Sequence, residues 1–90
     1  LDAGVIVVDT EMKVTNWNDR AEDLWGLRQE EVVNRLFLSL DIGLPVEKLS
    51  ALLKDCLKSG KTSELSLEAI NRRGQTITCQ VRCSASIHRA

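Results

Sequence analysis

The chain has 90 residues, a formal net charge of −1, and 28% charged and 43% hydrophobic residues. These values are those of one ordinary globular domain over residues 1–90, large enough for a modest core. The balanced charge, with two Trp, one Phe and no Tyr, gives neither the basic field nor the stacking surface that nucleic-acid binding needs. Because no apolar run approaches the roughly 20 residues of a membrane span, we also expect no membrane insertion.

The first residues and the cysteines indicate where the protein works. The segment LDAGVIVVD lacks the basic start of a signal peptide, and because it has no initiator Met we expect it to continue from a longer polypeptide. Cys79 and Cys83 stand four residues apart on an extended run, roughly 13 Å along a strand and too far for a disulfide. We therefore expect buried, reduced thiols and a cytoplasmic location.

Two short strands are expected near the start of the chain. Residues 4–8 (GVIVV) form a nearly continuous β-branched run, which is typical of a strand covered on both faces. Residues 13–17 alternate apolar and polar side chains and predict the second strand. The turn between them, residues 9–12, is short enough to force antiparallel pairing.

A helix is expected to follow the second strand at once. Asn18 is placed to cap its N-terminus through the side chain. Ala21, Leu24 and Trp25 recur at helical spacing and predict its apolar side, so Trp25 is expected in the core. Gly26 is expected to end the helix in the left-handed conformation.

Further helical pieces are expected in the middle of the chain. Residues 27–35 (LRQEEVVNR) predict a short helical turn that ends at Asn34, a residue that tolerates left-handed backbone. Residues 36–40 form a short apolar segment. A longer helix is predicted from Pro45 over residues 45–59, with Gly60 as its cap. Its apolar stripe consists of Val46, Leu49, Leu52, Leu53, Cys56 and Leu57.

Two long strands are expected to close the chain. Residues 62–71 and 75–87 alternate apolar and polar side chains around the turn NRRG, residues 71–74. The inward positions are Leu65, Leu67, Ala69, Ile77, Cys79, Val81, Cys83 and Ala85. Helices thus stand between two antiparallel hairpins, which predicts an α+β fold with all helices on one face of a single antiparallel sheet.

The whole pattern resembles the PAS domain family of sensory modules. Residues 4–34, GVIVVDTEMKVTNWNDRAEDLWGLRQEEVVN, are similar to the first half of the family, and residues 71–86, NRRGQTITCQVRCSAS, to its late hairpin. More narrowly, NWNDRAEDLWGL and LDIGLPVEKL are similar to the PAS segment of bacterial chemotaxis methylesterase–methyltransferase fusion proteins. This narrower resemblance implies that the enzymatic domains lie elsewhere in the parent chain.

The sequence departs from the family pattern at two places. The family usually has Gly where this chain has Asn34. The resemblance also implies a fifth strand at the centre of the sheet and an Asp-x-Thr output motif, both beyond Ala90. The final central strand is therefore expected to be absent from this chain, and we expect further residues or a neighbouring molecule to cover the open sheet edge.

Catalysis, metal binding and the best-known PAS cofactors are not expected. The single His88 has no nucleophile or metal-ligand partner that sequence spacing suggests. The flavin-photosensing subfamily has a reactive Cys where this chain has NRLFLS, and haem-binding members use a His on the long helix, which here has none. Cys56 is an alternative iron ligand on that helix, but packing in the apolar stripe is favoured.

An apolar pocket for a small molecule remains open as a possibility, beside a filled core with no cavity. The filled core is favoured because binding pockets carry convergent polar groups and these inward positions are nearly all apolar. Trp17 fits a pocket mouth, the space under the helices or a dimer contact. The expected lining residues are Ile6, Val8, Leu24, Trp25, Leu36, Leu49, Leu53, Leu65, Leu67, Cys79 and Val81.

Three functions are weighed on these grounds. The first is a non-catalytic sensory or relay module that dimerises through PAS–PAS contacts and passes changes in packing to a fused effector. The second is a structural homodimerisation module with a filled core and no ligand. The third is a thiol redox sensor using Cys79 or Cys83, which the inward orientation of both side chains disfavours.

Overall fold

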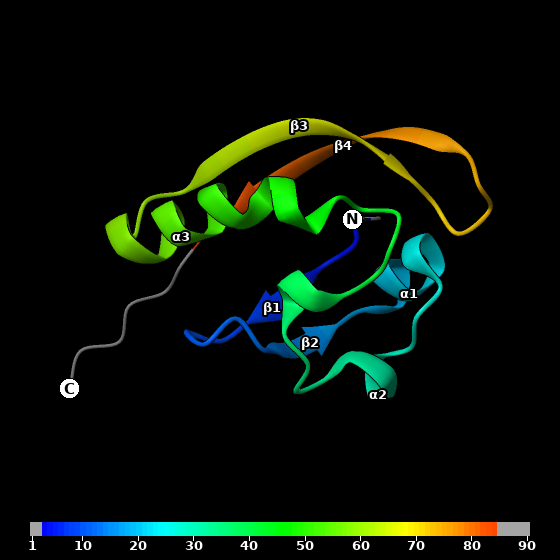
Figure 1. The fold of residues 1–90 in the computed structure, drawn as a ribbon, viewed down its shortest axis with the longest axis horizontal. Helices are drawn as coiled ribbons and strands as arrows, with labels where there is room; N and C mark the ends of the chain where they lie inside the picture. The colour runs from blue at the N-terminus through cyan, green and yellow to red at the C-terminus, as the bar shows by residue number, and fades with distance from the viewer. Residues whose placement is uncertain (1–2, 85–90) are drawn as a thin grey trace.

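Two β-hairpins frame a middle region of short helices in the computed structural model, which describes residues 3–84 (Figure 1). The first hairpin pairs β1 (Ile6–Val8) antiparallel with β2 (Val14–Trp17), and the second pairs β3 (Ser63–Ile70) antiparallel with β4 (Thr76–Cys83). Between them lie α1 (Asp19–Trp25), α2 (Gln29–Val32), the 3-10 turns η1 (Phe37–Ser39) and η2 (Val46–Leu49), and α3 (Ser50–Ser59). The predicted α+β class is confirmed.

Asn18 organises the corner between β2 and α1, as the sequence predicts. Its Oδ1 accepts hydrogen bonds from the Ala21 backbone N–H at 3.0 Å and from the Val5 N–H at 2.9 Å. Its Nδ2 donates to the Ala3 carbonyl at 3.0 Å. One side chain therefore caps the helix and also fixes the chain that enters β1. The predicted left-handed end of α1 is confirmed, with φ 78° at Gly26.

The expectation that the first strand is covered on both faces is wrong. Ile6 and Val8 pack against the core, whereas Val5 and Val7 are 50% and 44% exposed. Within residues 3–84, β1 pairs with β2 alone and belongs to a two-stranded sheet. A continuous β-branched run indicates strand propensity, but whether other elements cover both faces of the strand depends on its tertiary neighbours.

The long helix is divided into two parts. Pro45 lies outside it at ψ 81°, and η2 winds as a 3-10 turn in which the Lys48 N–H donates to the Pro45 carbonyl at 3.0 Å. A 3-10 turn eclipses residues three apart, so Val46 and Leu49 are both buried on the same side. The α-helical part therefore begins at Ser50, and Gly60 ends it with φ 71°, as predicted.

The register of the second hairpin agrees with the predicted alternation. Leu65 pairs with Val81, Leu67 with Cys79 and Ala69 with Ile77, so the inward positions of β3 and β4 face each other across the ladder. The turn has Gly74 at φ 77°. The predicted continuation of the last strand over residues 85–87 lies outside the described residues.

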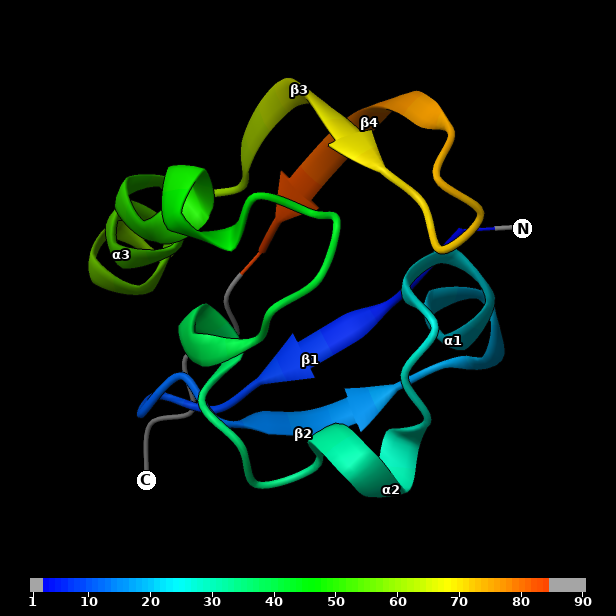
Figure 2. The same cartoon turned by 45° about the vertical axis from the view of Figure 1, so that its right-hand side comes forward.

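Residues 3–84 contain two separate two-stranded sheets (Figure 2), which is the arrangement expected of a sheet that lacks its central strand. Within that range, the main-chain hydrogen bonds that join the β3–β4 hairpin to the first half of the chain run from the Ile70 N–H to the Gly43 carbonyl at 3.0 Å and from the Arg72 N–H to the Leu24 carbonyl at 2.8 Å. We call these two bonds the junction. The expected central strand stays a prediction.

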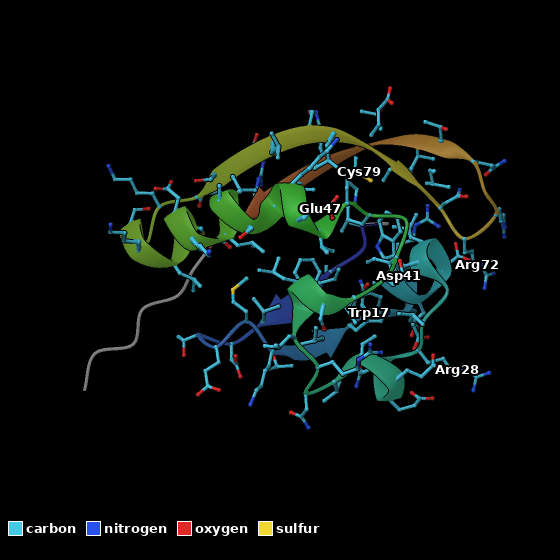
Figure 3. The ribbon with its side chains drawn as sticks, viewed as in Figure 1. Trp17, Arg28, Asp41, Glu47, Arg72 and Cys79 are labelled. Atoms are coloured by element: carbon cyan, nitrogen blue, oxygen red, sulfur yellow. The ribbon has the colours of Figure 1, made fainter. Side chains whose placement is uncertain are left out.

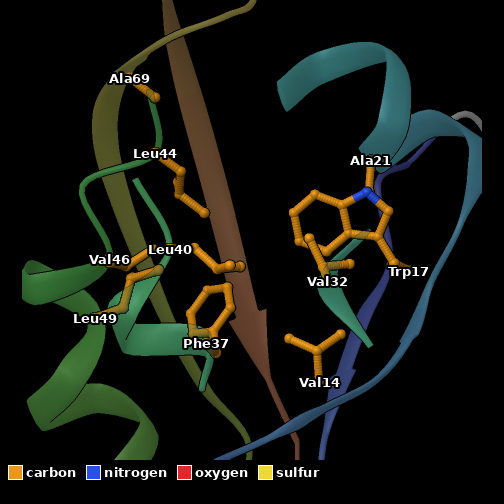
Figure 4. Packing of buried hydrophobic residues seen from close by; sticks show 10 residues of the cluster. All are labelled: Val14, Trp17, Ala21, Val32, Phe37, Leu40, Leu44, Val46, Leu49 and Ala69. Atoms are coloured by element: carbon orange, nitrogen blue, oxygen red, sulfur yellow. The ribbon is translucent and has the colours of Figure 1, made fainter. Parts of the chain in front are cut away.

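The core lies between the two hairpins and is built largely from the first half of the chain (Figure 4). Trp17 is 1% exposed, and its Nε1–H donates to the Leu27 carbonyl at 2.9 Å. Trp17 therefore packs under the helices, while Trp25, which was expected in the core, is only partly buried against it. The fully buried cluster comprises Val14, Trp17, Ala21, Val32, Phe37, Leu40, Leu44, Val46, Leu49 and Ala69.

The substitution Gly43→Ala is a direct test of the junction. A Cβ at Gly43 would lie 1.5 Å from the Ile70 carbonyl oxygen, so Gly43→Ala must push the hairpin away. We expect a loss of roughly 2–4 kcal/mol in the free energy of unfolding, measured by denaturant titration. Gly74→Ala is the matched control: it meets nothing within 4 Å, and only its φ of 77° is strained, at about 1–2 kcal/mol. Equal losses in the two variants would contradict a tight junction.

Asn18 offers a second test. Asn18→Ala removes both accepted hydrogen bonds and the donated one, so we expect a loss of roughly 1–3 kcal/mol in the free energy of unfolding. Asn18→Asp keeps the acceptor at the helix N-terminus and loses only the donor to Ala3, so its loss should be clearly smaller. Thermal or chemical unfolding curves that coincide for the two variants would show that capping is not the main role of Asn18.

Candidate functional site

The candidate site is the apolar space between the helices and the two hairpins. The structure brings most of the predicted lining residues to the border of the core: Ile6, Val8, Trp25, Leu53, Leu67, Cys79 and Val81 all pack against it while remaining partly exposed. Leu49 lies inside the core at 1% exposure. Leu36 and Leu65 do not fit the predicted lining, because they are 49% and 37% exposed. Leu24 is partly buried beside the junction.

The segment from η1 to η2 supplies the side chains that fill the middle of this space. Phe37, Leu40 and Leu44 are each at most 5% exposed and face Trp17 and Val32 across the core (Figure 4). The sequence marks residues 36–40 as apolar but has no periodicity that would assign them inward positions. A short apolar loop segment, rather than a regular element, therefore occupies the centre of the predicted pocket.

The interior is apolar throughout the described residues. Within residues 3–84, no buried side chain is polar or charged, and no buried side-chain nitrogen or oxygen lacks a hydrogen-bond partner. Such an interior has no directional polar group that could orient a ligand.

Cys79 of β4 lies at the border of the core (Figure 3), and Cys83 stands four residues further along the same strand and is partly buried. Burial raises the pKa of the Cys79 thiol. Burial, followed by a hydrogen bond and the charge interaction with Cys56, raises the pKa of Cys83 to about 12. A fast thiol sensor needs a lowered pKa, so these shifts oppose the interpretation of Cys79 or Cys83 as a reactive thiolate.

A polar pocket of about 160 Å³ lies at the junction, where the β3–β4 turn meets α1. Asp23 sits between two arginines: its Oδ1 accepts from Arg72 Nη2 at 3.2 Å and its Oδ2 from Arg20 Nη1 at 2.7 Å. Of the predicted lining residues only Leu24 belongs to it, and the sequence alone did not reveal this contact. The full lining is Arg20, Asp23, Leu24, Asn71, Arg72, Arg73 and Gln75.

Over the described residues, no group of three or more His, Cys, Asp or Glu side chains is arranged to hold a metal ion. None of the helices in this part of the chain is both long and apolar enough to cross a bilayer. His88 lies outside the described residues.

The raised pKa of Cys83 predicts a pH dependence of stability. The unfolded thiol ionises near its ordinary value of 9.0, whereas the folded thiol keeps its proton until about pH 12. Unfolding therefore releases a proton above pH 9, and the stability contribution present below pH 9 is lost as the pH rises toward 12. Under a reductant, the free energy of unfolding should fall more steeply between pH 8 and pH 10.5 in the parent than in Cys83→Ser. Parallel slopes would contradict the shift.

Comparison with known proteins identifies the family. A search of curated proteins finds no significant match. The family model described as the PAS fold matches residues 1–90. The short helices between two antiparallel hairpins agree with this match. The chain belongs to the PAS family, whose domains are sensory or signalling modules.

Proposed function

We propose that this domain is a non-catalytic sensory or relay module in a larger cytoplasmic signalling protein of a bacterium. It passes ligand- or partner-dependent changes in packing to a fused effector. The observation that carries the proposal is the PAS match over residues 1–90. PAS domains commonly dimerise and sit within larger signalling proteins, which supports both a PAS–PAS homodimer and a fused effector as partners.

The division into two hairpins supports a relay mechanism. The β3–β4 hairpin has its own eight-residue ladder and meets the first half of the chain through the junction and apolar side chains. A small change at the border of the core can therefore shift the hairpin as a unit. A ligand or partner transmits a signal only if it binds one hairpin position more tightly than the other.

The apolar interior supports a role without catalysis. The buried side chains between the hairpins are apolar, and the pKa values of the Cys79 and Cys83 thiols are both raised. We propose no flavin or haem cofactor. If a ligand binds, the partly exposed border residues of β1, β3 and β4 favour a small apolar molecule over a charged one.

The narrower similarity of residues 16–27 and 40–49 favours a particular parent protein. We propose a chemotaxis methylesterase–methyltransferase fusion protein, in which the methyl-group chemistry belongs to other domains. In the structure, the first segment runs from β2 through Asn18 and α1, and the second contains Gly43 of the junction.

Exposed apolar side chains support the second candidate, a homodimerisation module with a filled core. Val5 and Val7 on or beside β1, together with Leu36 and Ile70, are 44–53% exposed. Large exposed aliphatic side chains mark interaction surfaces when they lie close together. Native mass spectrometry separates the two candidates: a copurifying small molecule supports sensing, and an apo dimer supports scaffolding.

Arg72 provides the test of the relay. In the full-length parent protein, Arg72→Ala removes the ion pair with Asp23 at the junction. We expect the loss to weaken coupling by ~0.7 kcal/mol, which changes the effect of the stimulus on effector output by roughly threefold. Arg82→Ala, which removes an exposed ion pair with Glu64 inside the hairpin, is the matched control and should leave regulation unchanged. Unaltered effector regulation after deletion of the whole domain would refute the sensory function.

A further inference from the structure

The polar pocket at the junction gathers positive charge from two elements. Helix α1 contributes Arg20 and Asp23 to its lining, and the β3–β4 turn contributes Arg72 and Arg73. Three guanidinium groups therefore surround one carboxylate, which gives this lining a formal charge of +2. We propose that the pocket binds a phosphate group, either as inorganic phosphate or as the monoester of a small molecule. This binding site does not depend on the sensory function.

The backbone of the turn holds its two arginines in place. The Arg72 N–H donates to the Leu24 carbonyl at 2.8 Å, which keeps the turn against the end of α1. The Asn71 Oδ1 accepts from the N–H groups of Arg73 and Gln75, each at 3.0 Å. Figure 3 shows Arg72 beside α1. Both arginines therefore extend from a hydrogen-bonded turn, so less ordering is needed when a ligand binds.

The pocket has more positive charge and more donors than Asp23 can satisfy. Arg72 donates to Asp23 through Nη2 at 3.2 Å, and a guanidinium has five N–H donors. Within residues 3–84, Arg73 has no ion-pair partner. Gln75 accepts the Asn71 amide through Oε1 at 3.0 Å, so its NH2 group remains a neutral donor. A second anion is what this lining can still accommodate.

A phosphate group matches the pocket in size and charge. The volume of about 160 Å³ is close to the roughly 150 Å³ of a cavity that holds benzene, so a small ligand fits. A phosphate monoester carries nearly two negative charges and has three acceptor oxygens, which arginine side chains bind in pairs. A monocarboxylate would bring one charge against the repulsion of Asp23, and a cation would face three arginines. A bound phosphate would contact both α1 and the turn.

Arginine footprinting of the full-length parent protein tests the proposal. Phenylglyoxal modifies accessible arginines, and peptide mass spectrometry gives a rate for each one. Inorganic phosphate or glycerol phosphate, at an ionic strength matched with sodium chloride, should slow the modification of Arg72 and Arg73 by roughly threefold when about two thirds of the sites are filled. Arg35, exposed and outside the pocket, is the internal control and should keep its rate. Comparison of the two probes identifies the better source of the phosphate group.

Two substitutions with opposite expected effects make the test specific. Asp23→Asn removes the negative charge that repels a phosphate, so the concentration that half-protects Arg73 should fall by roughly 3–10-fold. Arg73→Gln removes a positive charge, so the concentration that half-protects Arg72 should rise by a similar factor. Arg35→Gln changes the net charge as Arg73→Gln does and should leave the half-protecting concentration unchanged. All three positions are exposed or partly exposed, so the variants should keep the fold.

Four outcomes would overturn the assignment. They are no protection of Arg72 and Arg73 by either probe, equal protection of Arg35, equal protection by chloride alone, and an unchanged or weaker affinity in Asp23→Asn. The first would show that the pocket does not bind phosphate, and the next two that the anion only screens charge. The last would show that phosphate, if it binds, lies away from the Asp23 carboxylate.

Discussion

The architecture depends on how the β3–β4 hairpin is held against the rest of the domain. The hairpin carries its own eight-residue ladder, and two main-chain hydrogen bonds, Ile70 to Gly43 and Arg72 to Leu24, position it over the core. Apolar contacts provide most of the attraction but little direction, whereas these bonds fix position. Gly43 is essential to this arrangement because a Cβ would collide with the Ile70 carbonyl. The domain thus consists of a packed first half and a docked hairpin.

This arrangement provides a physical mechanism for a signalling role. Trp17 is buried in the core of the first half, and its indole N–H donates a hydrogen bond to the Leu27 carbonyl. The border of the core remains partly open along β1, β3 and β4. A ligand or partner at that border would act on the docked hairpin more easily than on the packed half, because dense cores resist deformation.

Local features of the fold could be predicted from the sequence, whereas relations between distant segments could not. The Asn18 cap, the left-handed Gly26 and Gly60, and the hairpin register depend on neighbouring residues and were predicted correctly. The residues of the candidate site were predicted less accurately than these local features. Leu36 was placed inward because it is apolar, yet its outward position depends on which residue of a short irregular segment turns to the core.

Native-state hydrogen exchange tests the docked-hairpin arrangement most directly. The amides of Ile70 and Arg72 donate to the first half of the chain, whereas the ladder amides of β3 and β4 donate within the hairpin. If the hairpin moves as a unit, the amides of Ile70 and Arg72 should exchange through an opening of lower free energy than the one that exposes the ladder. Exchange of these two amides only through global unfolding, with the same free energy as the amides of the core, would contradict the account.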